Sequence, residues 1–513
     1  MKIDVSFRGI RRLINRRIFI ILLILGQIVL TALILYRATW LRGVLIVFSV
    51  VTALHLLIRR DKSAFKLSLI FLILLFPVFG GAFYWIFHTQ TYSIGYRKRL
   101  AGVEKNSHDA LELSEDRTND AAHALPSVQK QLFYMQNHTP FPLYSHTESQ
   151  YFSSGAEMLP AFLNDLKCAK HYIFLEYFII EDGKMWRAVL DVLQERAAAG
   201  VDVRIVYDDL GCFLTLPPNY PKYLRMVGIQ CEKFNRFHPF LNSTQNNRDH
   251  RKIAVIDGKI AYTGGINLAD EYIGERIKHG RWKDNAIRLS GDGAWSFAVI
   301  FLQVWGLLTK QEADYLAFRP SPDASSSDAL YSDGWVQPYA DGPMSVENIG
   351  EQVYLHVIED ARRYLYITTP YLMVDDAMIA ALESAAKCGV DVRIITPEIP
   401  DKRTVHFTTR SYYRTLLRAG VRIYEYRGGF MHAKSFVSDD TVATVGTFNL
   451  DFRSLYLHFE CGVCLYGTSS IAALKTDFLD TLADCREFTE ADCKSNPFVR
   501  FFQSICRIFA PLM

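Results

Sequence analysis

An internal repeat constrains the fold of this chain more than any other feature. The segment Gly200-Val-Asp-Val-Arg-Ile-Val206 recurs as Gly389-Val-Asp-Val-Arg-Ile-Ile395. Each copy follows an Ala-rich helical pattern and precedes a turn, which is typical of a buried parallel strand. A second pair of similar segments, 171–176 and 363–368, precedes the first pair in the same order. The repeat therefore predicts two similar α/β lobes.

A short motif, His-x-Lys-x4-Asp, follows each copy of the repeat. The first copy consists of His250, Lys252 and Asp257, and the second of His432, Lys434 and Asp439. A small-residue turn that ends in an asparagine, Asn267 or Asn449, comes next in both halves. One such motif could arise by chance on a solvated hairpin, but duplication with matching asparagines favours a single composite site.

Each motif predicts a β-hairpin. In the first copy we expect strands at 252–256 and 259–262, because Asp257-Gly258 is a strong two-residue turn signal. In the second copy we expect strands at 434–437 and 441–445. Residues i and i+2 share one face of a strand, so the His and Lys of a motif point to the same place. Asp257 and Asp439 fall at the turns, and we expect them to organise the hairpins.

Two histidines and two lysines in one site suit attack on a phosphodiester. That reaction needs a nucleophile, an acid for the leaving oxygen, and positive charge on the non-bridging oxygens. One imidazole attacks phosphorus to form a covalent phospho-enzyme, and the other protonates the leaving alcohol and later activates the acceptor. Lys252 and Lys434 supply charge, while Asn267 and Asn449 are candidate amide donors to the phosphate.

Two acidic residues further along the chain are candidates for orienting the histidines. Asp284 follows Trp282-Lys283, and Glu460 follows His458-Phe459. A carboxylate on the second ring nitrogen fixes the tautomer of a catalytic histidine, although ordinary structural salt bridges would explain both residues equally well. We expect no metal at the two motif histidines, because the lysine beside each would repel a cation.

The N-terminal part predicts a membrane anchor over residues 1–90. A basic arm precedes three apolar stretches, Ile18–Tyr36, Gly43–Ile58 and Leu67–Phe87, each near the length that spans a bilayer. A signal peptide would explain the first stretch, and buried soluble helices all three, but their clustering favours two or three membrane spans. Pro77 and Gly80-Gly81 allow the third stretch to be kinked or re-entrant.

Basic residues do not determine which side of the membrane carries the lobes. The N-terminal arm and the loop at 59–66 both favour the cytoplasm, whereas a third span would place the lobes outside. Arg97, Lys98 and Arg99 after that stretch favour the inside. A polar linker is predicted at 91–135, a first lobe at 136–325 and a second at 326–513. The net charge of +3 and the absence of a basic track in the lobes argue against a nucleic-acid partner.

At these residues the chain resembles the phospholipase D superfamily and, within it, the bacterial cardiolipin synthases. The segments that carry the resemblance are His250–Asp257, Thr263–Asn267, Trp282–Asp284, Gly446–Ser454, the Pro- and Gly-containing segment Phe76–Tyr84, and the Pro-Leu ending of Ile508–Met513. The resemblance covers about residue 41 to the end. It implies two phospholipase D-like lobes, each a mixed sheet flanked by helices, that share one active site.

The resemblance also implies a reaction. Members of that family transfer a phosphatidyl group between two phosphatidylglycerol molecules, giving cardiolipin and glycerol, with no metal or nucleotide cofactor. It implies His250 as nucleophile and His432 as acid/base, at the membrane of a bacterial cell. Two departures stand out: the stretch Ile18–Tyr36 is an addition before the usual membrane segments, and His458 stands where the family more often has asparagine.

Other functions fit the motifs as well. A membrane-anchored phospholipase D or phosphatidyltransferase would use water or another alcohol as acceptor. A nuclease of the same superfamily is disfavoured by the anchor, and an inactive lipid-binding scaffold by the intact His, Lys and Asn in both halves. The sequence makes no prediction of oligomeric state.

Overall fold

The computed structural model describes residues 39–59, 62–77, 80–87, 109–237, 243–320, 334–345, 347–494 and 496–513, with a few isolated positions before residue 109. The chain divides into two compact units. An N-terminal unit contains residues 1–93 with 235–247, and a main unit contains residues 94–234 and 248–511. The first predicted span, Ile18–Tyr36, and the predicted junction between the lobes lie outside the described residues, apart from isolated positions.

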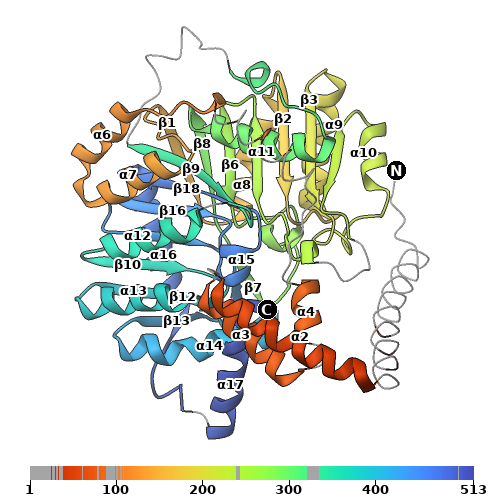
Figure 1. The fold of residues 1–513 in the computed structure, drawn as a ribbon. Helices are drawn as coiled ribbons and strands as arrows, with labels where there is room; N and C mark the ends of the chain where they lie inside the picture. The colour runs from red at the N-terminus through yellow and green to blue at the C-terminus, as the bar shows by residue number, and fades with distance from the viewer. Residues whose placement is uncertain are drawn as a thin grey trace. The chain divides into compact units, whose positions relative to one another are not determined.

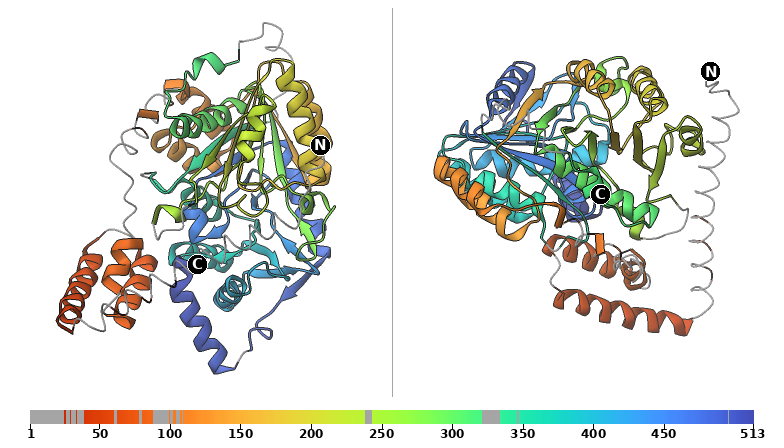
Figure 2. Two further views of the ribbon diagram at one scale, coloured as in Figure 1. Left: turned by 90° about the vertical axis from the view of Figure 1, so that its right-hand side faces the viewer. Right: turned by 90° about the horizontal axis from the view of Figure 1, so that it is seen from above.

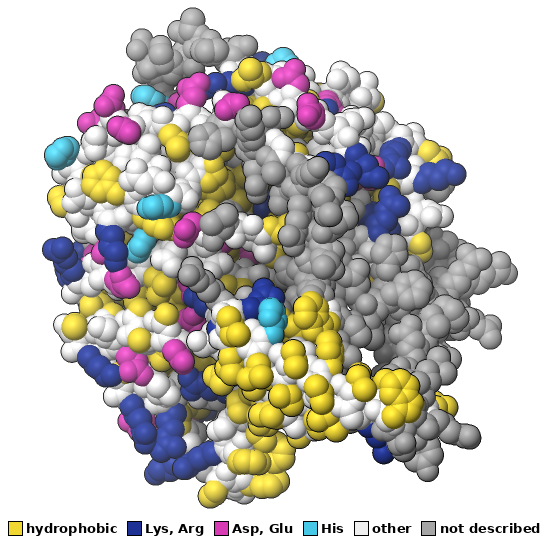
Figure 3. All heavy atoms as spheres, in the orientation of Figure 1, with side chains coloured by type: hydrophobic (Ala, Val, Ile, Leu, Met, Phe, Trp, Pro, Cys, Tyr) yellow, Lys and Arg dark blue, Asp and Glu magenta, His cyan; other side chains and the backbone are white. Residues whose placement is uncertain are grey.

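The N-terminal unit contains one helix that is long and apolar enough to cross a membrane, among the residues that the structure describes. This helix, α2 (Thr39–Ile58), includes the second predicted span. Its apolar stretch of 19 residues is about 29 Å long at 1.5 Å per residue, close to the thickness of a bilayer's hydrocarbon core. Figure 3 shows hydrophobic side chains on its surface, as a lipid-facing helix requires.

The third apolar stretch is not one continuous helix. It forms α3 (Ser63–Leu75) and α4 (Gly80–Phe87), separated around Pro77, which has no N–H to continue a helix. Gly81 lies against α2, where a Cβ would be 2.8 Å from Ser49 Oγ, and its N–H donates to that oxygen. The two-to-three-span anchor therefore stays a prediction beyond α2.

Two sheets of the same strand order form the main unit (Figure 1). The order in the first lobe is β1-β8-β6-β5-β2-β3-β4. The second lobe repeats it as β9-β18-β16-β15-β10-β12-β13 and adds β19 at the edge. In each lobe the last three strands of the repeated order are parallel and the others antiparallel. The predicted pair of α/β lobes with mixed sheets is confirmed.

The strands of the first lobe are β1 (Thr147–Phe152), β2 (Tyr172–Tyr177), β3 (Asp202–Asp208), β4 (Gln230–Phe234), β5 (Lys252–Ile256), β6 (Ile260–Gly264) and β8 (Ala286–Gly291). Those of the second are β9 (Trp335–Asp341), β10 (Tyr364–Thr368), β12 (Asp391–Pro397), β13 (Arg422–Tyr426), β15 (Ser435–Ser438), β16 (Val442–Gly446), β18 (Glu460–Tyr466) and β19 (Cys485–Phe488). Two small pairs join other segments: β7 (Arg281–Lys283) with β14 (Gly429–Met431), and β11 (Leu372–Met373) with β17 (Leu450–Asp451).

The repeated Val-Asp-Val-Arg segments are β3 and β12, which have the same alternation of buried and half-buried residues. In each, the aspartate and the arginine two residues later lie on one face and form an ion pair. The distances are 2.7 Å for Arg204 Nη2 to Asp202 Oδ2 and 3.0 Å for Arg393 Nε to Asp391 Oδ1. The valines and isoleucines face the core. The repeated sequence therefore has apolar residues for the buried face of the strand and an ion pair for the other face.

Helices flank both sheets (Figures 1 and 2). They are α8 (Gly155–Lys167), α9 (Lys184–Ala198), α10 (Tyr220–Met226), α11 (Ala294–Thr309), α12 (Ile349–Asp360), α13 (Asp376–Lys387), α14 (Arg403–Arg418), α15 (Phe452–Tyr456), α16 (Ser469–Ala483) and α17 (Pro497–Phe509). Short 3-10 turns lie at 126–128, 243–246, 270–273, 316–318 and 510–512. Helix α11 is apolar on all sides and buried, and it contacts β2 of the first lobe and β9 of the second.

Much of the predicted linker is folded. Despite its polar composition it contains two helices that pack on each other, α6 (Glu115–Ala124) and α7 (Gln129–His138), and α7 also packs on α12. Only a narrow stripe is apolar: Leu132 and Met135 are buried, and Tyr134 packs edge-on against His356 of α12 with 5.0 Å between ring centroids. A stripe this narrow gives little periodic signal in the sequence, which is why the predicted linker at 91–135 includes α6 and most of α7.

Candidate active site

Both motifs form the predicted hairpins. The first connects β5 to β6 through Asp257 and Gly258, with φ of 52° and 66°. The second connects β15 to β16 through Asp439 and Asp440, with φ of 55° and 61°. Positive φ at both central residues is the requirement of a type I′ turn, which Asp and Gly tolerate. Both lobes therefore use the same type of turn to connect the strand that follows the motif lysine to its antiparallel neighbour.

The motif aspartates bind the backbone and lie outside the cavity that contains the histidines. The Asp257 carboxylate accepts N–H groups from residues 170, 171 and 172, each at 2.8 Å. Asp439 accepts the equivalent three from residues 362, 363 and 364 at 2.7–2.9 Å. Each aspartate thus ties its hairpin to the start of β2 or β10. This geometry fits the organising role expected for the turns and does not place either carboxylate near a reacting atom.

Backbone pairing between the lobes places both histidines. Strand β14, just before His432, pairs in parallel with β7 of the first lobe, and the His432 N–H donates to the Lys283 carbonyl at 2.7 Å. On the other side Asp249 forms a bridge with Phe459, and the His250 N–H donates to the Phe459 carbonyl at 2.9 Å. Each histidine therefore lies beside the segment of the other lobe that carries an acidic residue.

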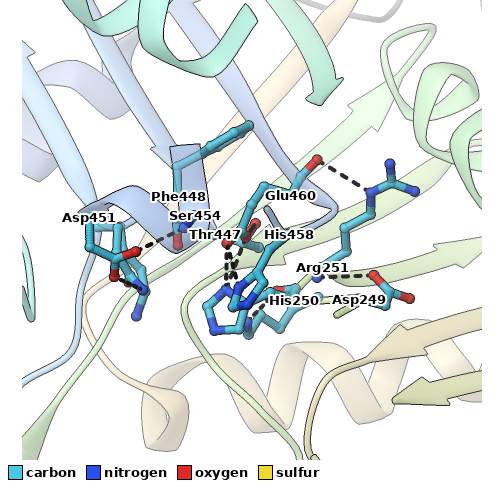
Figure 4. A network of polar contacts seen from close by, with 12 residues as sticks. Asp249, His250, Arg251, Thr447, Phe448, Asp451, Ser454, His458 and Glu460 are labelled. Carbon is cyan, nitrogen blue, oxygen red and sulfur yellow. Dashed lines mark hydrogen bonds and ion pairs between the residues drawn. The ribbon is translucent and has the colours of Figure 1, made fainter. Parts of the chain in front are cut away.

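The two histidine–acid pairs both cross between the lobes. His250 Nδ1 lies 2.9 and 3.0 Å from the two carboxylate oxygens of Glu460, and His432 Nδ1 lies 2.6 Å from Asp284 Oδ2. Figure 4 shows the first pair, with His250, two residues before β5, facing Glu460 of β18. A carboxylate on Nδ1 leaves Nε2 unprotonated and free to act. Asp284 and Glu460 thus occupy the positions that an orienting acid needs.

The acids are held differently. Gly265 leaves space for Asp284, because a Cβ there would lie 1.9 Å from Asp284 Oδ1. The equivalent residue of the second lobe is Thr447, whose hydroxyl donates to the longer Glu460 side chain. The Asn285 N–H also donates to Asp284, at 2.9 Å. Both lobes therefore place an acid beside a histidine, but different neighbouring groups hold the two acids.

Burial and neighbouring charges make the two pairs electrostatically unequal. Burial raises the pKa of Glu460 to about 7, although Lys252 opposes the change. Burial also raises the pKa of Asp284, but His432 and Lys434 have the larger combined effect and hold this pKa below its usual value. Burial and the charges of Lys252 and Lys434 hold the pKa of His250 well below its usual value. Burial and Lys434 lower the pKa of His432 to about 4, against the opposing effect of Asp284.

Both motif lysines are buried at the site. Lys252 and Lys434 are each 1% exposed, and each amine contacts the carbonyl of its own motif histidine. Lys434 Nζ also lies 2.9 Å from His432 Nδ1. Burial lowers the pKa of Lys252 to about 8 and that of Lys434 to about 7. These amines are desolvated charges, which act strongly on an anion brought between them.

The two asparagines line the same cavity but are partly engaged by protein groups. Asn267 Oδ1 accepts the Ile179 N–H at 3.0 Å, and its Nδ2 donates to the Tyr272 hydroxyl at 2.6 Å. Asn449 Nδ2 donates to Asp451 at 3.2 Å. A role for either amide in binding phosphate stays a prediction.

His458 lies at the site, although the sequence indicates it only as a departure from the family pattern and not as a candidate site residue. It lines the cavity, its ring centroid is 5.8 Å from that of His250, and both of its ring nitrogens are buried without a hydrogen-bond partner (Figure 4). Burial and His250 hold its pKa well below the usual value. Its position two residues before Glu460, in place of the family's asparagine, was the available signal.

Ligand atoms of His250, His458 and Glu460 lie within 4.8 Å of one another, a spacing that suits a metal ion. The buried amine of Lys252 acts on all three groups. A cation there would meet that charge at close range, so the expectation of a metal-free site stays a prediction on electrostatic grounds.

Both histidines open into one cavity of about 660 Å³. Aromatic rings form much of its wall: Phe178 packs edge-on against His250, while Trp282 and Phe430 pack against His432 with centroids 5.1 and 5.7 Å away. The cavity is also lined by Asn267, Tyr272, Tyr371, Lys402, Asn449, Arg453, His458, Ala510 and Met513. It combines the two histidines and the basic side chains of Lys402 and Arg453 with an apolar wall, as an amphipathic phosphate ester requires.

Comparison with known proteins identifies the family. The family model described as "Cardiolipin synthase, PLD-like domain" matches residues 162–278 and 354–482, one stretch within each lobe. A cardiolipin synthase from Halalkalibacterium halodurans is 30% identical over 94% of this chain and 97% of its own length. The chain belongs to the cardiolipin synthase family. A protein from Streptococcus mutans, described only as uncharacterized, is 39% identical over 90% of this chain and 99% of its own length.

A solved structure shows the same fold in a more distant protein. The phosphatidylserine synthase of Haemophilus influenzae has a TM-score of 0.53 and 14% identity, covering 71% of this chain and 94% of its own. The identity is low, so the likeness concerns the fold. This member of the cardiolipin synthase family thus has the phospholipase D-like arrangement of two lobes.

Proposed function

We propose that the protein is a cardiolipin synthase, which transfers a phosphatidyl group from one phosphatidylglycerol to a second and releases glycerol. The observation that supports this most is the pair of crossed contacts, His250 with Glu460 and His432 with Asp284. Both histidines line one cavity, and a buried lysine contacts each of them. Family membership and the apolar cavity wall favour a phospholipid as substrate.

In the first half-reaction His250 attacks phosphorus through Nε2. A P–N bond forms, and the P–O bond to the glycerol headgroup breaks. His432 donates its Nε2 proton to the departing glycerol oxygen. Lys252 and Lys434 stabilise the negative charge on the non-bridging oxygens in the transition state.

The unequal acids support this division of roles. Asp284 stays ionised and close to His432, so His432 is the more readily protonated imidazole once a phosphate enters. Glu460 has a pKa near 7 and stabilises a positive charge on His250 less. His250 therefore remains neutral, which suits a nucleophile, and His432 suits the acid.

In the second half-reaction the acceptor is the headgroup hydroxyl of another phosphatidylglycerol. Neutral His432 takes the hydroxyl proton, the oxygen attacks phosphorus, and the P–N bond to His250 breaks. Two phosphatidylglycerol molecules thus give one cardiolipin and one glycerol. One phosphodiester replaces another, so the exchange needs no external energy source.

The proposed location is a bacterial cell membrane. Helix α2 is the described segment that supports it, and the flanking apolar stretches of the sequence support a multi-pass anchor. Anchoring keeps the enzyme next to a substrate that is confined to the bilayer.

The test is a product assay. Detergent-solubilised full-length protein is incubated with labelled phosphatidylglycerol, and the products are identified by mass. Cardiolipin and free glycerol in equal amounts are expected, and both should disappear in His250→Ala and His432→Ala. Phosphatidic acid with glycerol, in place of cardiolipin, would indicate a phospholipase D and overturn the proposal.

A further inference from the structure

Helix α17, the last helix of the chain, has one apolar and one polar face. At 100° per residue, Phe498, Phe501, Phe502, Ile505 and Phe509 fall on one side. Arg500, Gln503, Ser504 and Arg507 fall on the other. The side chains therefore separate cleanly by chemistry around the helix.

The apolar face is exposed over its first turns, whereas Ile505 and Phe509 further along the helix are half-buried. None of the residues of α17 is buried, and Phe498, Phe501 and Phe502 are 66%, 61% and 43% exposed. These three rings pack on one another, with centroids 4.7 and 6.0 Å apart. Figure 3 shows hydrophobic side chains gathered where Figure 1 draws α17. Adjacent exposed phenylalanines on one helix face are typical of a surface that contacts another apolar phase.

The C-terminal end of α17 is attached to the wall of the active-site cavity. The Arg507 guanidinium lies 4.4 Å from the centre of the Tyr412 ring on α14. Just beyond the helix, Ala510 and Met513 line the cavity that contains His250 and His432. Arg453, another lining residue, donates to the Met513 carbonyl. The exposed helix is therefore coupled directly to the site of the reaction.

We propose that α17 lies in the membrane–water interface and holds the opening of the active-site cavity at the lipid surface. The phenylalanines enter the acyl-chain region, while Arg500 faces anionic headgroups. The helix has 13 residues and is about 20 Å long, too short to span a bilayer, so it lies along the surface. This docking deepens the proposed function, because an anionic phospholipid is both the contact and the substrate.

The bilayer is favoured over a second protein chain as the occupant. The polar face of α17 carries cations and no acidic residue, which complements an anionic lipid surface. A phospholipid must also leave the bilayer only partly to reach His250, and a cavity wall that ends in an interfacial helix shortens that path.

The test uses full-length protein in phosphatidylcholine–phosphatidylglycerol vesicles that contain a lipid with a photoactivatable diazirine in its acyl chain. Labelled residues are then located by mass. Label on Phe498, Phe501 and Phe502, with none on Arg500 or Gln503, is expected, and label on α2 serves as the positive control. Label on α2 with none over 496–509 would overturn the proposal.

A variant series tests the consequence for turnover. Phe498→Ser, Phe501→Ser and Phe502→Ser combined should lower kcat/KM for phosphatidylglycerol in vesicles at least tenfold. Turnover of a monomeric short-chain phosphatidylglycerol in solution should stay within about twofold of wild type, and so should vesicle activity of the polar-face control Gln503→Ser. Equal losses on both substrates would contradict interfacial docking. Photolabelling of α17 without any cardiolipin synthesis would leave the docking intact and overturn the proposed function alone.

Discussion

The Nδ1 atom of His432 lies 2.6 Å from the Oδ2 atom of Asp284, a carboxylate that the other lobe contributes. The equivalent contact joins His250 to Glu460 in the opposite direction. Each lobe thus supplies the histidine of one pair and the acid of the other, so neither lobe contains a complete site. Duplication alone would give two sites, and the crossed pairing is what makes them one.

Asp284→Asn should remove the charge that orients His432. The amide can donate to Nδ1 and stabilise the wrong tautomer, so we expect kcat to fall by about 10²- to 10⁴-fold with little change in KM. Steady-state kinetics on phosphatidylglycerol, with a thermal unfolding curve to show that the variant folds, measures this. Retention of more than a tenth of the wild-type kcat would show that Asp284 is an ordinary structural partner.

Asp257→Ala should lower stability while largely preserving kcat, the reverse of what we expect for Asp284→Asn. Loss of three backbone hydrogen bonds to a carboxylate is expected to lower the free energy of unfolding by about 2–4 kcal/mol. The folded fraction should keep kcat within about tenfold of wild type. The equivalent Asp439→Ala is the matched variant in the second lobe. A kcat loss as large as that of Asp284→Asn, in a protein of unchanged stability, would place the aspartate in the chemistry.

Activity should fall as pH rises above about 7–8. The lowered pKa values of Lys434, about 7, and Lys252, about 8, mean that each amine loses its charge as pH rises through that range. Uncharged amines no longer stabilise the phosphate oxygens, so kcat/KM declines on the alkaline side. In Lys434→Arg the guanidinium stays charged, and the alkaline limb should move to higher pH even if the maximum is lower. An unchanged alkaline limb in that variant would exclude Lys434 as its cause.

His458→Asn should change neither kcat nor stability by much. The ring nitrogens of His458 make no hydrogen bond in the described part of the chain, and Nδ1 lies 3.9 Å from Glu460 Oε1. Burial lowers the pKa of His458, so the ring is neutral and its contact with Glu460 is weak. We expect kcat to stay within about threefold of wild type and the unfolding temperature to hold or rise. A loss comparable to that of Glu460→Gln, measured in the same assay, would make His458 a participant in the reaction.

Much of this arrangement was predictable because it is local in sequence. The Val-Asp-Val-Arg strands, the Asp-containing turns and the shared face of His and Lys all follow from periodicity and turn chemistry within a few residues. Pairing of β7 with β14 is different, because three-residue strands from separate lobes carry no periodic signal. The sequence therefore identified Asp284 and Glu460 as candidates without indicating which histidine each one contacts.

Two other features could not be predicted from the sequence, because they depend on contacts between distant segments or have little periodic signal. Helices α6 and α7 are polar except for a narrow stripe that includes Leu132 and Met135, so composition alone favours a linker. The inequality between Glu460 and Asp284 depends on burial and on Thr447 replacing Gly265, which only the assembled site reveals.

The most direct test of the account is to locate the covalent intermediate. Enzyme mixed with phosphatidylglycerol is quenched in denaturant at mildly basic pH, which preserves both the phosphorus–nitrogen bond and the acyl esters, and the modified peptide is identified by mass. We expect the phosphatidyl group on His250, and it should accumulate in His432→Ala when the substrate carries a p-nitrophenol leaving group that needs no acid. A phosphatidyl group on His432, or its formation in His250→Ala, would contradict the assignment of the two histidines.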